Sequence, residues 1–401
     1  MSIREIKPGN RGYLYVNSHP TGCAAVVDRM WQQIPEATAD EPGPVALVIG
    51  SSAGYGLAAT VVGLRAHRMR GLGIAFESAE TERRTAGAGW YRTARTAGLA
   101  AEAGAAFSFL NADAFSDVVK DAATDQLADR FGKIDLLIYS IAAPRRTDPL
   151  TGEVHHSVIK PLGADYRAKT LVFEDGVPQL GELHLQAADD AERDATVQVM
   201  GGADWQMWIN ALQSKGLLAD GFQTVALSYV GSDITAPIYR AGTIGAAKQH
   251  LEDTARAINT RLKGVGHAYT VVAGAAVTQA STAIPSIALY TSILHRVTAD
   301  RWQTTVDQAE ALWNRMTGHA DLGLDDQGRI RLDDWEMNPE VQAAVRAVWD
   351  RVGSDDLAVS TDTEWFRDQV GQLYGWNVPG VDYVTPAETT VPWPASPSAD
   401  A

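Results

Sequence analysis

The stretch VALVIGSSAGYG, residues 45–56, decides the fold of this chain. Its first residues, Val45–Ile49, are all apolar and rich in β-branched side chains, which is typical of a buried strand. The strand pattern stops at Gly50, and after Gly54 and Gly56 the chain continues with a helical pattern to residue 67. Glycine lets the main chain turn tightly and approach a pyrophosphate, and a helix N-terminus offers free N–H groups to that anion. The stretch therefore predicts a dinucleotide-binding turn; a turn that needs glycine only for its geometry is the alternative.

Strands and helices alternate on both sides of this turn. Further strands are expected at 73–77, 106–110, 134–139, 224–229 and 268–273, and helices at 90–103, 115–131, 243–261, 287–298, 304–316 and 338–352. Apolar strands that alternate with helices are typical of a parallel sheet covered on both faces. We therefore predict an α/β fold with a single Rossmann-type parallel sheet, flanked by helices on both faces, of an extended short-chain dehydrogenase type. Inserted elements at 142–196 and additional C-terminal elements complete it.

We expect residues 1–384 to form one dinucleotide-binding catalytic domain with inserted substrate-binding or lid elements. Residues 385–401 are rich in Pro, Ser, Thr and Ala and are expected to form a flexible tail, in which Trp393 could hold part of the chain in place.

The overall charge and composition exclude several partners. The chain carries a net charge of −15, and so acidic a surface repels nucleic acid and anionic membranes. Its apolar stretches are too short to span a bilayer, and the first residues lack the apolar region of a signal peptide. Cys23 is the only cysteine, so an intramolecular disulfide is impossible. We expect a cytoplasmic protein without a nucleic-acid or membrane partner.

Several side chains follow the predicted strands on the edge where such sheets bind ligands. Ser51 and Ser52 can add hydroxyl donors to the glycine turn. Glu77 ends the second predicted strand, where a carboxylate can accept hydrogen bonds from the adenosine ribose and repel the extra phosphate of NADPH. This favours NADH, although Glu77 could be a solvated surface residue and Arg83 and Arg84 lie close behind it.

Two further pairs occupy the same edge. Asp113 and Ala114 follow the third strand, and Ile141 and Ala142 follow the fourth. Asp113 could hold the adenine amino group, cap the helix expected after it, or do both.

A tyrosine and a lysine stand out in the second half. Reduction of a polarised double bond builds negative charge on a carbonyl oxygen, so the site needs a donor there, and a phenol near an ammonium group is suitable. Short-chain dehydrogenases place the two residues four apart, and this chain has no such pair. Tyr239 and Lys248 are nine apart, which on one helix would put them on opposite faces. Tyr239 should therefore precede the helix, with Gly242 and Gly245 easing a close approach; a packed tyrosine and a solvated lysine are the alternative.

The chain resembles the FabV-type enoyl-acyl-carrier-protein reductases and trans-2-enoyl-CoA reductases, which form one family. Besides the glycine turn, the resemblance rests on His19–Cys23, 85–87, 89–91, Asp113–Asp117, Tyr139–Thr147, Met200–Trp208, Tyr239–Lys248, Val277–Ser281, Asp326–Arg331 and Gly380–Tyr383. It covers essentially the whole chain. Arg240 and Ala241 depart from the family pattern beside the key tyrosine, where we expect them to alter the pocket wall and the acyl-chain preference.

The resemblance implies roles for individual residues. Tyr239 corresponds to the proton donor, Lys248 to the lysine that binds NADH and supports it, and Tyr229 to a substrate-binding tyrosine. The implied NADH contacts are Gly50, Ser51, Ser52, Ala53, Gly54, Tyr55, Phe76, Glu77, Asp113, Ala114, Ile141, Ala142, Lys248, Val277, Thr278 and Gln279. The implied reaction is NADH-dependent reduction of the 2,3 double bond of an enoyl-CoA or enoyl-acyl-carrier-protein thioester in lipid metabolism, by a monomer with a lid after Thr278.

Other features have weaker claims. A carbonyl (β-ketoacyl) reductase and a non-catalytic NADH-sensing protein remain the alternatives. Arg145 and Arg146 could contact substrate phosphates or bond to loop carbonyls and carboxylates. His155-His156 and Asp189-Asp190 are better explained as exposed loop residues than as metal ligands, because nicotinamide-driven reduction needs no metal.

Overall fold

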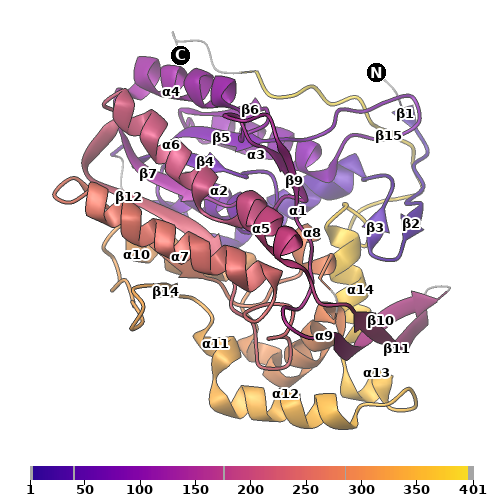
Figure 1. The fold of residues 1–401 in the computed structure, drawn as a ribbon. Coiled ribbons are helices and arrows are strands. Elements are labelled where there is room, and N and C mark those ends of the chain that lie inside the picture. Colours follow the sequence, from indigo (N-terminus) through magenta and orange to yellow (C-terminus); the bar gives the residue numbers. More distant parts are fainter. Residues whose placement is uncertain (1–2, 39–40, 175–176, 285, 396–401) are drawn as a thin grey trace.

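The computed structural model describes residues 3–38, 41–174, 177–284 and 286–395. At its centre is a seven-stranded parallel sheet in the order β14-β13-β12-β7-β4-β5-β6 (Figure 1). Its strands are β4 (Val45–Ile49), β5 (Arg70–Ala75), β6 (Phe107–Asn111), β7 (Ile134–Tyr139), β12 (Leu218–Ser228), β13 (Gly266–Val272) and β14 (Ile330–Arg331). The strand order reverses between β4 and β7, and ligands bind at the carboxyl ends of the strands at such a point. The prediction of a Rossmann-type parallel sheet is confirmed.

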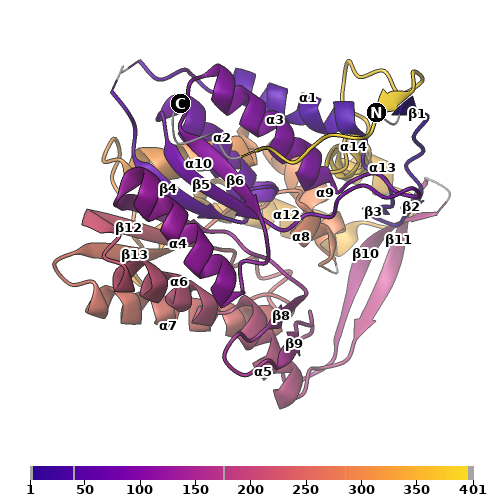
Figure 2. The ribbon, with the colours of Figure 1, turned by 90° about the horizontal axis from the view of Figure 1, so that it is seen from above.

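Helices cover both faces of this sheet, as Figure 2 shows. Successive side chains of a strand point to opposite faces, so Ala46 and Val48 join one hydrophobic cluster while Val45, Leu47 and Ile49 join the other. The first cluster is covered by α1 (Pro20–Gln33), α2 (Gly54–Ala66), α3 (Ala88–Glu102) and α10 (Thr305–Met316). The second is covered by α4 (Asp117–Phe131), α6 (Ala203–Ser214) and α7 (Thr243–Arg261).

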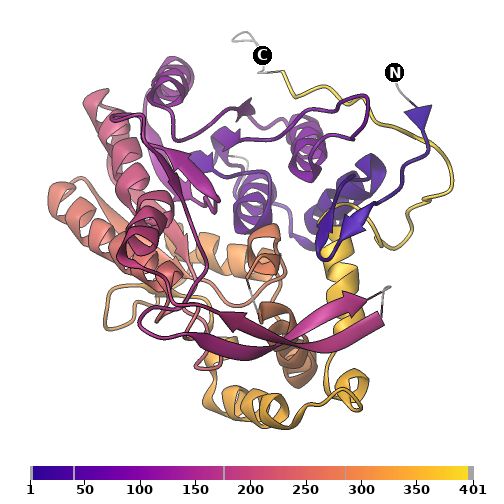
Figure 3. The ribbon, with the colours of Figure 1, turned by 45° about the vertical axis from the view of Figure 1, so that its right-hand side comes forward.

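The inserted segment contains more regular structure than expected. It forms the hairpins β8 (Arg145–Thr147) with β9 (Val154–His156) and β10 (Tyr166–Glu174) with β11 (Val177–Leu185), followed by α5 (Asp190–Met200). The longer hairpin lies against the C-terminal helices (Figure 3), where Lys169 Nζ donates to the carbonyls of Trp349 and Val352. The insertion therefore joins the domain rather than extending from it.

The C-terminal part forms a third hydrophobic cluster beside the carboxyl edge of the sheet. The helices of this C-terminal part are α8 (Gln279–Thr282), α9 (Ile287–Thr298), the 3₁₀ turn η1 (Ala299–Arg301), α11 (Asp334–Met337), α12 (Pro339–Arg351), α13 (Leu357–Ser360) and α14 (Thr363–Gln372). Within the described ranges, none of the helices combines the length and apolarity needed to cross a bilayer.

A strand near the start of the chain pairs with one from its last part. Strand β1 (Ile3–Arg4) pairs with β15 (Ala387–Glu388), close to the small hairpin of β2 (Asn10–Arg11) and β3 (Leu14–Tyr15). Trp393 Nε1 donates to the carbonyl of Phe109 at 3.1 Å, and its ring packs edge to face on Trp90. Residues 385–395, which we expected to belong to a flexible tail, thus contact the domain through Trp393. Residues 396–401 lie outside the described residues.

Candidate active site

The glycine turn is built for close approach. Gly50 has a φ of +89°, and a Cβ there would lie 2.2 Å from the carbonyl oxygen of Ser140. A Cβ on Gly56 would lie 2.0 Å from the carbonyl oxygen of Gly50. Helix α2 begins at Gly54 without a side-chain cap, so its first amides are free to bind an anion. These features fit the pyrophosphate of NADH.

Both serines of the turn are held by the protein. Ser51 Oγ donates to the carbonyl of Ile74 at 3.2 Å, and Ser52 Oγ donates to Glu77 Oε1 at 2.7 Å. The expected hydroxyl donors are therefore already engaged, and the main chain carries the anion-binding groups.

Glu77 lies two residues beyond the end of β5, not within the strand as the sequence suggested. Asn111 holds its main chain through both of its amide atoms, at 2.7 and 3.0 Å. Gly87 and Gly89 leave room for the carboxylate, because a Cβ on Gly89 would lie 1.9 Å from Glu77 Oε1. Burial raises the pKa of Glu77, while the hydrogen bond from Ser52 opposes that shift. The structure thus fixes a carboxylate beside the dinucleotide turn, and Asn111, which sequence reasoning missed, orients it.

The other predicted cofactor residues also lie in loops at the carboxyl ends of the strands. Asp113 Oδ1 accepts from the N–H of Phe115 at 3.0 Å, but α4 begins only at Asp117, so Asp113 closes a turn before the helix instead of capping it. Thr278 caps α8 and comes within van der Waals distance of the position a Cβ would take on Gly54. Ala114, Ile141, Ala142 and Val277 also lie in these loops, and Gln279 is the first residue of α8.

Tyr239 and Lys248 have the arrangement expected from their spacing. Tyr239 lies in a turn before α7, and Lys248 lies on α7. Positions for a Cβ on Gly245 and Gly242 fall 2.4 Å from the carbonyl oxygen of Tyr239 and 2.8 Å from that of Lys160, so only glycine allows this fold of the chain. Lys248 Nζ donates to the carbonyl of Leu227 at 3.1 Å, and burial lowers its pKa to about 8.

Three tyrosines, Tyr55, Tyr229 and Tyr239, lie at this part of the site. The rings of Tyr229 and Tyr239 meet edge to face with centroids 4.8 Å apart. Tyr239 is only 3% exposed, yet its hydroxyl has no hydrogen-bond partner among the described residues. Protein atoms do not enclose this hydroxyl completely. The hydroxyl of Tyr55 is already used, because it donates to the carbonyl of Gly274. Tyr239 therefore offers a free phenol.

Sequence reasoning missed the residues that hold these tyrosines. Glu336 accepts from the hydroxyls of Tyr229 and Tyr290, at 2.6 and 2.7 Å, and from the N–H of Ala275 at 2.6 Å. Burial raises the pKa of Glu336 to about 7. The sequence close to Glu336 contains one feature that could have drawn attention to it, the Asp326–Arg331 motif just before α11.

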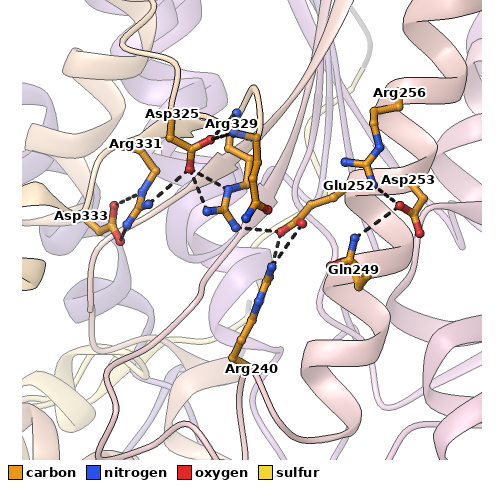
Figure 4. Close-up of polar contacts among 10 residues, drawn as sticks. Arg240, Gln249, Glu252, Asp253, Arg256, Asp325, Arg329, Arg331 and Asp333 are labelled. Carbon is orange, nitrogen blue, oxygen red and sulfur yellow. Dashed lines mark hydrogen bonds and ion pairs between the residues drawn. The ribbon is translucent and has the colours of Figure 1, made fainter.

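Arg240 does not line the pocket wall as we expected. Its guanidinium binds the buried carboxylate of Glu252 at 2.9 Å, and Arg329 binds the same carboxylate at 3.2 Å (Figure 4). Asp325 joins Arg329 to Arg331, which in turn binds Asp333. The departure from the family pattern at Arg240 thus enters an ion-pair network that joins α7 to the segment around β14.

The two arginines after β7 differ. Arg146 is 1% exposed and donates to the carbonyl of Gln198, so it is structural, whereas Arg145 is exposed. Asp189 caps α5, which explains the acidic pair. No group of side chains suited to hold a metal occurs in the described part of the chain. A cavity of about 950 Å³ lies at the amino ends of β12 and β13, away from this site.

Comparison with known proteins identifies the family. The family model for the trans-2-enoyl-CoA reductase catalytic region matches residues 84–317, and the NAD(P)H-binding domain of the same reductases matches residues 5–82. An enoyl-[acyl-carrier-protein] reductase [NADH] from Streptomyces avermitilis is 51% identical over 98% of this chain and 100% of its own length. A trans-2-enoyl-CoA reductase [NADH] from Clostridium perfringens is 39% identical over 96% and 99%.

A solved structure agrees. The trans-2-enoyl-CoA reductase from Treponema denticola in complex with NAD superposes with a TM-score of 0.90, at 33% identity, over 96% of this chain and 98% of that one. These findings support NADH as the cofactor and enoyl reduction over carbonyl reduction.

A third model, described as an enoyl reductase FAD-binding domain, matches residues 324–386. This segment has one two-residue strand, β14, and the first turn of the helix that follows it carries Asp334 and Glu336. Acidic side chains repel a phosphate at a helix N-terminus, so these residues do not fit a flavin dinucleotide, and we derive no step through one. From its full-length matches, the chain belongs to the family of NADH-dependent trans-2-enoyl-CoA and enoyl-acyl-carrier-protein reductases.

Proposed function

We propose that this protein saturates the 2,3 double bond of trans-2-enoyl thioesters, with Tyr239 and Lys248 as its catalytic residues. The observation that carries this assignment is the free phenol of Tyr239, buried beside Tyr229 at the carboxyl edge of the sheet. A reducible double bond conjugated to a carbonyl needs a donor at the carbonyl oxygen, and this phenol is available for that bond.

The cofactor site follows from the loops at the same edge. The Gly50–Tyr55 turn would hold the pyrophosphate, Phe76 and Glu77 the adenosine, and Asp113 with Ala114 the adenine. Ile141, Ala142 and Val277–Gln279 would line the nicotinamide half, and Lys248 its ribose. NADH, when bound, supplies the hydride that adds to the β-carbon.

The chain's own residues then manage charge and proton. As charge develops on the thioester carbonyl oxygen, Tyr239 donates a hydrogen bond to it, and protonation at the α-carbon completes the reduction with Tyr239 as the source of the proton. Burial, with the nearby Glu336 and Tyr55, raises the pKa of Tyr239 well above its usual value, so the phenol keeps its proton at neutral pH. The ammonium of Lys248 offsets the negative charge that remains.

We further propose one catalytic domain over residues 1–384, acting as a cytoplasmic monomer. Val48, Leu136 and Ile330, one from each of the three matched segments, share one hydrophobic cluster, which supports a single domain. The net charge of −15 favours separate copies. The thioester can come from coenzyme A or from a carrier protein, and the exposed Arg145 is a candidate contact for either phosphate.

The test is the oxidation of NADH with crotonyl-CoA, followed by its absorbance, with Tyr239→Phe as the matched control. Enoyl substrates of several lengths on coenzyme A and on a carrier protein complete the series. An absorbance that stays flat with all of them would overturn the proposal. Turnover of acetoacetyl-CoA alone would instead indicate carbonyl reduction, and NADH binding without any turnover would indicate a sensing protein.

A further inference from the structure

Glu336 is a fully buried carboxylate that meets the reductase site from the side of α11. No lysine, arginine or histidine forms an ion pair with it within the described ranges. Burying such a charge is costly unless hydrogen bonds satisfy it, and three short ones do: from Tyr229, from Tyr290 and from the N–H of Ala275. The positions of its three hydrogen-bond donors indicate what this buried carboxylate does in the site.

The three donors come from three different parts of the site. Tyr229 directly follows β12 and touches the ring of Tyr239. Ala275 lies between β13 and α8, in the loop that continues into Val277–Gln279. Tyr290 lies on α9, beyond Thr278, where a lid is expected. Glu336 is thus one point at which the substrate tyrosine, the cofactor loop and the lid helix are joined.

The hydrogen bonds also have a direction. An ionised carboxylate only accepts, so the O–H of Tyr229 must point at Glu336. Gln342 Nε2 donates to the hydroxyl of Tyr290 at 3.1 Å and to the carbonyl of Glu336 at 2.8 Å. Tyr290 therefore accepts a hydrogen bond from Gln342 and donates one to Glu336. Tyr229 also donates its hydrogen to Glu336, so the oxygen of Tyr229 presents only lone pairs, and no hydrogen, to the pocket.

We propose that Glu336 is a positioning residue, which draws the O–H of Tyr229 away from the substrate so that Tyr239 donates to the thioester carbonyl without competition. The proposal rests on the proposed function for the identity of that carbonyl. It does not make Glu336 a catalytic residue, because the carboxylate acts through Tyr229.

The proposal has a pH signature. The titratable groups that face Glu336 are Tyr229, Tyr290, Tyr239, Tyr55 and Asp333. Below a pH of about 7 the carboxyl gains a proton, which it must donate to Tyr229 or to Tyr290, the two phenols bound to the same oxygen. Reversal of the bond to Tyr229 turns that hydroxyl toward the substrate. The KM for the thioester is therefore expected to fall below this pH in the wild type and to be flat in Glu336→Gln.

The decisive experiment is a double-mutant cycle between Glu336→Gln and Tyr229→Phe on the full-length protein. Glutamine keeps the shape, but its NH2 group either donates to the phenols, which reverses their hydrogen bonds, or faces the N–H of Ala275, which is also a donor. We expect kcat/KM for crotonyl-CoA to fall about tenfold in the wild-type background and less than about twofold when Tyr229 is already Phe, since coupled residues are not additive. Glu252→Gln, which removes the charge of a buried glutamate elsewhere, should be additive with Tyr229→Phe. Equal effects of Glu336→Gln in both backgrounds would overturn the proposal.

A second variant covers the case in which Glu336→Gln does not fold. Tyr290→Phe removes one donor and leaves the bonds from Tyr229 and Ala275. Its effect on kcat/KM should also shrink in the Tyr229→Phe background, and additivity there would overturn the proposal equally.

The infrared band of the protonated Glu336 carboxyl provides a readout that does not depend on turnover. It should appear as the pH falls, vanish in Glu336→Gln and shift in Tyr229→Phe. A wild-type protein that shows this band and no enoyl reduction would refute the proposed function alone. Turnover with a band that Tyr229→Phe leaves unshifted would refute the positioning role alone.

Discussion

The ring of Tyr239 packs edge to face against that of Tyr229, with centroids 4.8 Å apart, but their hydroxyls differ in hydrogen bonding. The hydroxyl of Tyr229 is bound to Glu336, whereas that of Tyr239 has no partner among the described residues. Two similar side chains in contact are therefore divided between a structural bond and a free donor.

Tyr239→Phe is expected to lower kcat about 10²- to 10³-fold, because it removes the donor to the developing oxyanion. The melting temperature should stay within about 2 °C of the wild type, because the structure loses no hydrogen bond. Steady-state kinetics and thermal denaturation measure the two effects.

Tyr91→Phe is the matched control. The Tyr91 side chain, on α3, is 2% exposed and its oxygen accepts from the N–H of Ala86 at 3.1 Å. The variant should lose about 1–3 kcal/mol of unfolding free energy, because a buried donor is left unpaired, and keep its kcat. The reverse pattern in the two variants would contradict the assignment of Tyr239.

The activity should fall as the pH rises through about 8, because Lys248 then loses its proton. The raised pKa of Tyr239 means that the phenol does not lose its proton in this range, so we assign this alkaline limb of the pH profile to the lysine. The sign for stability is the opposite: the folded-state pKa lies below the unfolded value of 10.5, the unfolded chain holds more protons between the two, and stability rises with pH there.

A pH profile of kcat/KM at saturating NADH measures the limb, and Lys248→Met should abolish it while raising the KM for NADH about tenfold or more. Lys263→Met, at an exposed position just after α7, is the control and should leave the profile unchanged. A limb that persists without Lys248 would assign it to another group.

Gly89→Ala should weaken the preference for NADH over NADPH about tenfold or more, because its Cβ would lie 1.9 Å from Glu77 Oε1 and displace the carboxylate that repels the extra phosphate. Glu77→Gln should have the same direction. The ratio of kcat/KM for the two cofactors measures the effect.

Gly98→Ala in the same helix is the control. The nearest atom to its Cβ would be Arg95 Nη1 at 3.5 Å, an ordinary contact, so the cofactor ratio should stay unchanged. An unchanged ratio in Gly89→Ala as well would show that the position of Glu77 does not select the cofactor.

Arg240→Met should cost about 1 kcal/mol of unfolding free energy and leave the chain-length preference within about twofold, because the partly exposed guanidinium binds Glu252 rather than the pocket. Arg329→Met should cost more, about 3 kcal/mol, since Arg329 is nearly buried and also holds Asp325. Denaturant titration and a series of enoyl-CoA lengths test both. A marked shift of chain length in Arg240→Met would return this residue to the pocket wall.

Much of the fold was accessible from the sequence because it depends on local patterns. Strands 45–49 and 134–139 and the helices 243–261 and 287–298 lie where periodicity placed them. Element ends were less accurate: β5 ends at Ala75, so Glu77 lies in the loop beyond it. The inserted hairpin β10–β11 was largely missed. Along β11 the side chains alternate only between exposed and partly buried, and the surface that the hairpin packs on belongs to helices far away in the sequence.

The sequence by itself determined the glycine turn, the parallel sheet and the separation of Tyr239 from the helix of Lys248. Each follows from spacing: glycine where the chain approaches itself, period in strands and helices, and the angle between residues nine apart. Only the tertiary structure decided how the site is held. Glu336 lies 107 residues from Tyr229 and 46 from Tyr290, and Arg240 turns to Glu252 instead of the pocket. No local pattern encodes such contacts, because a buried carboxylate is stabilised only by donors that distant segments bring to it.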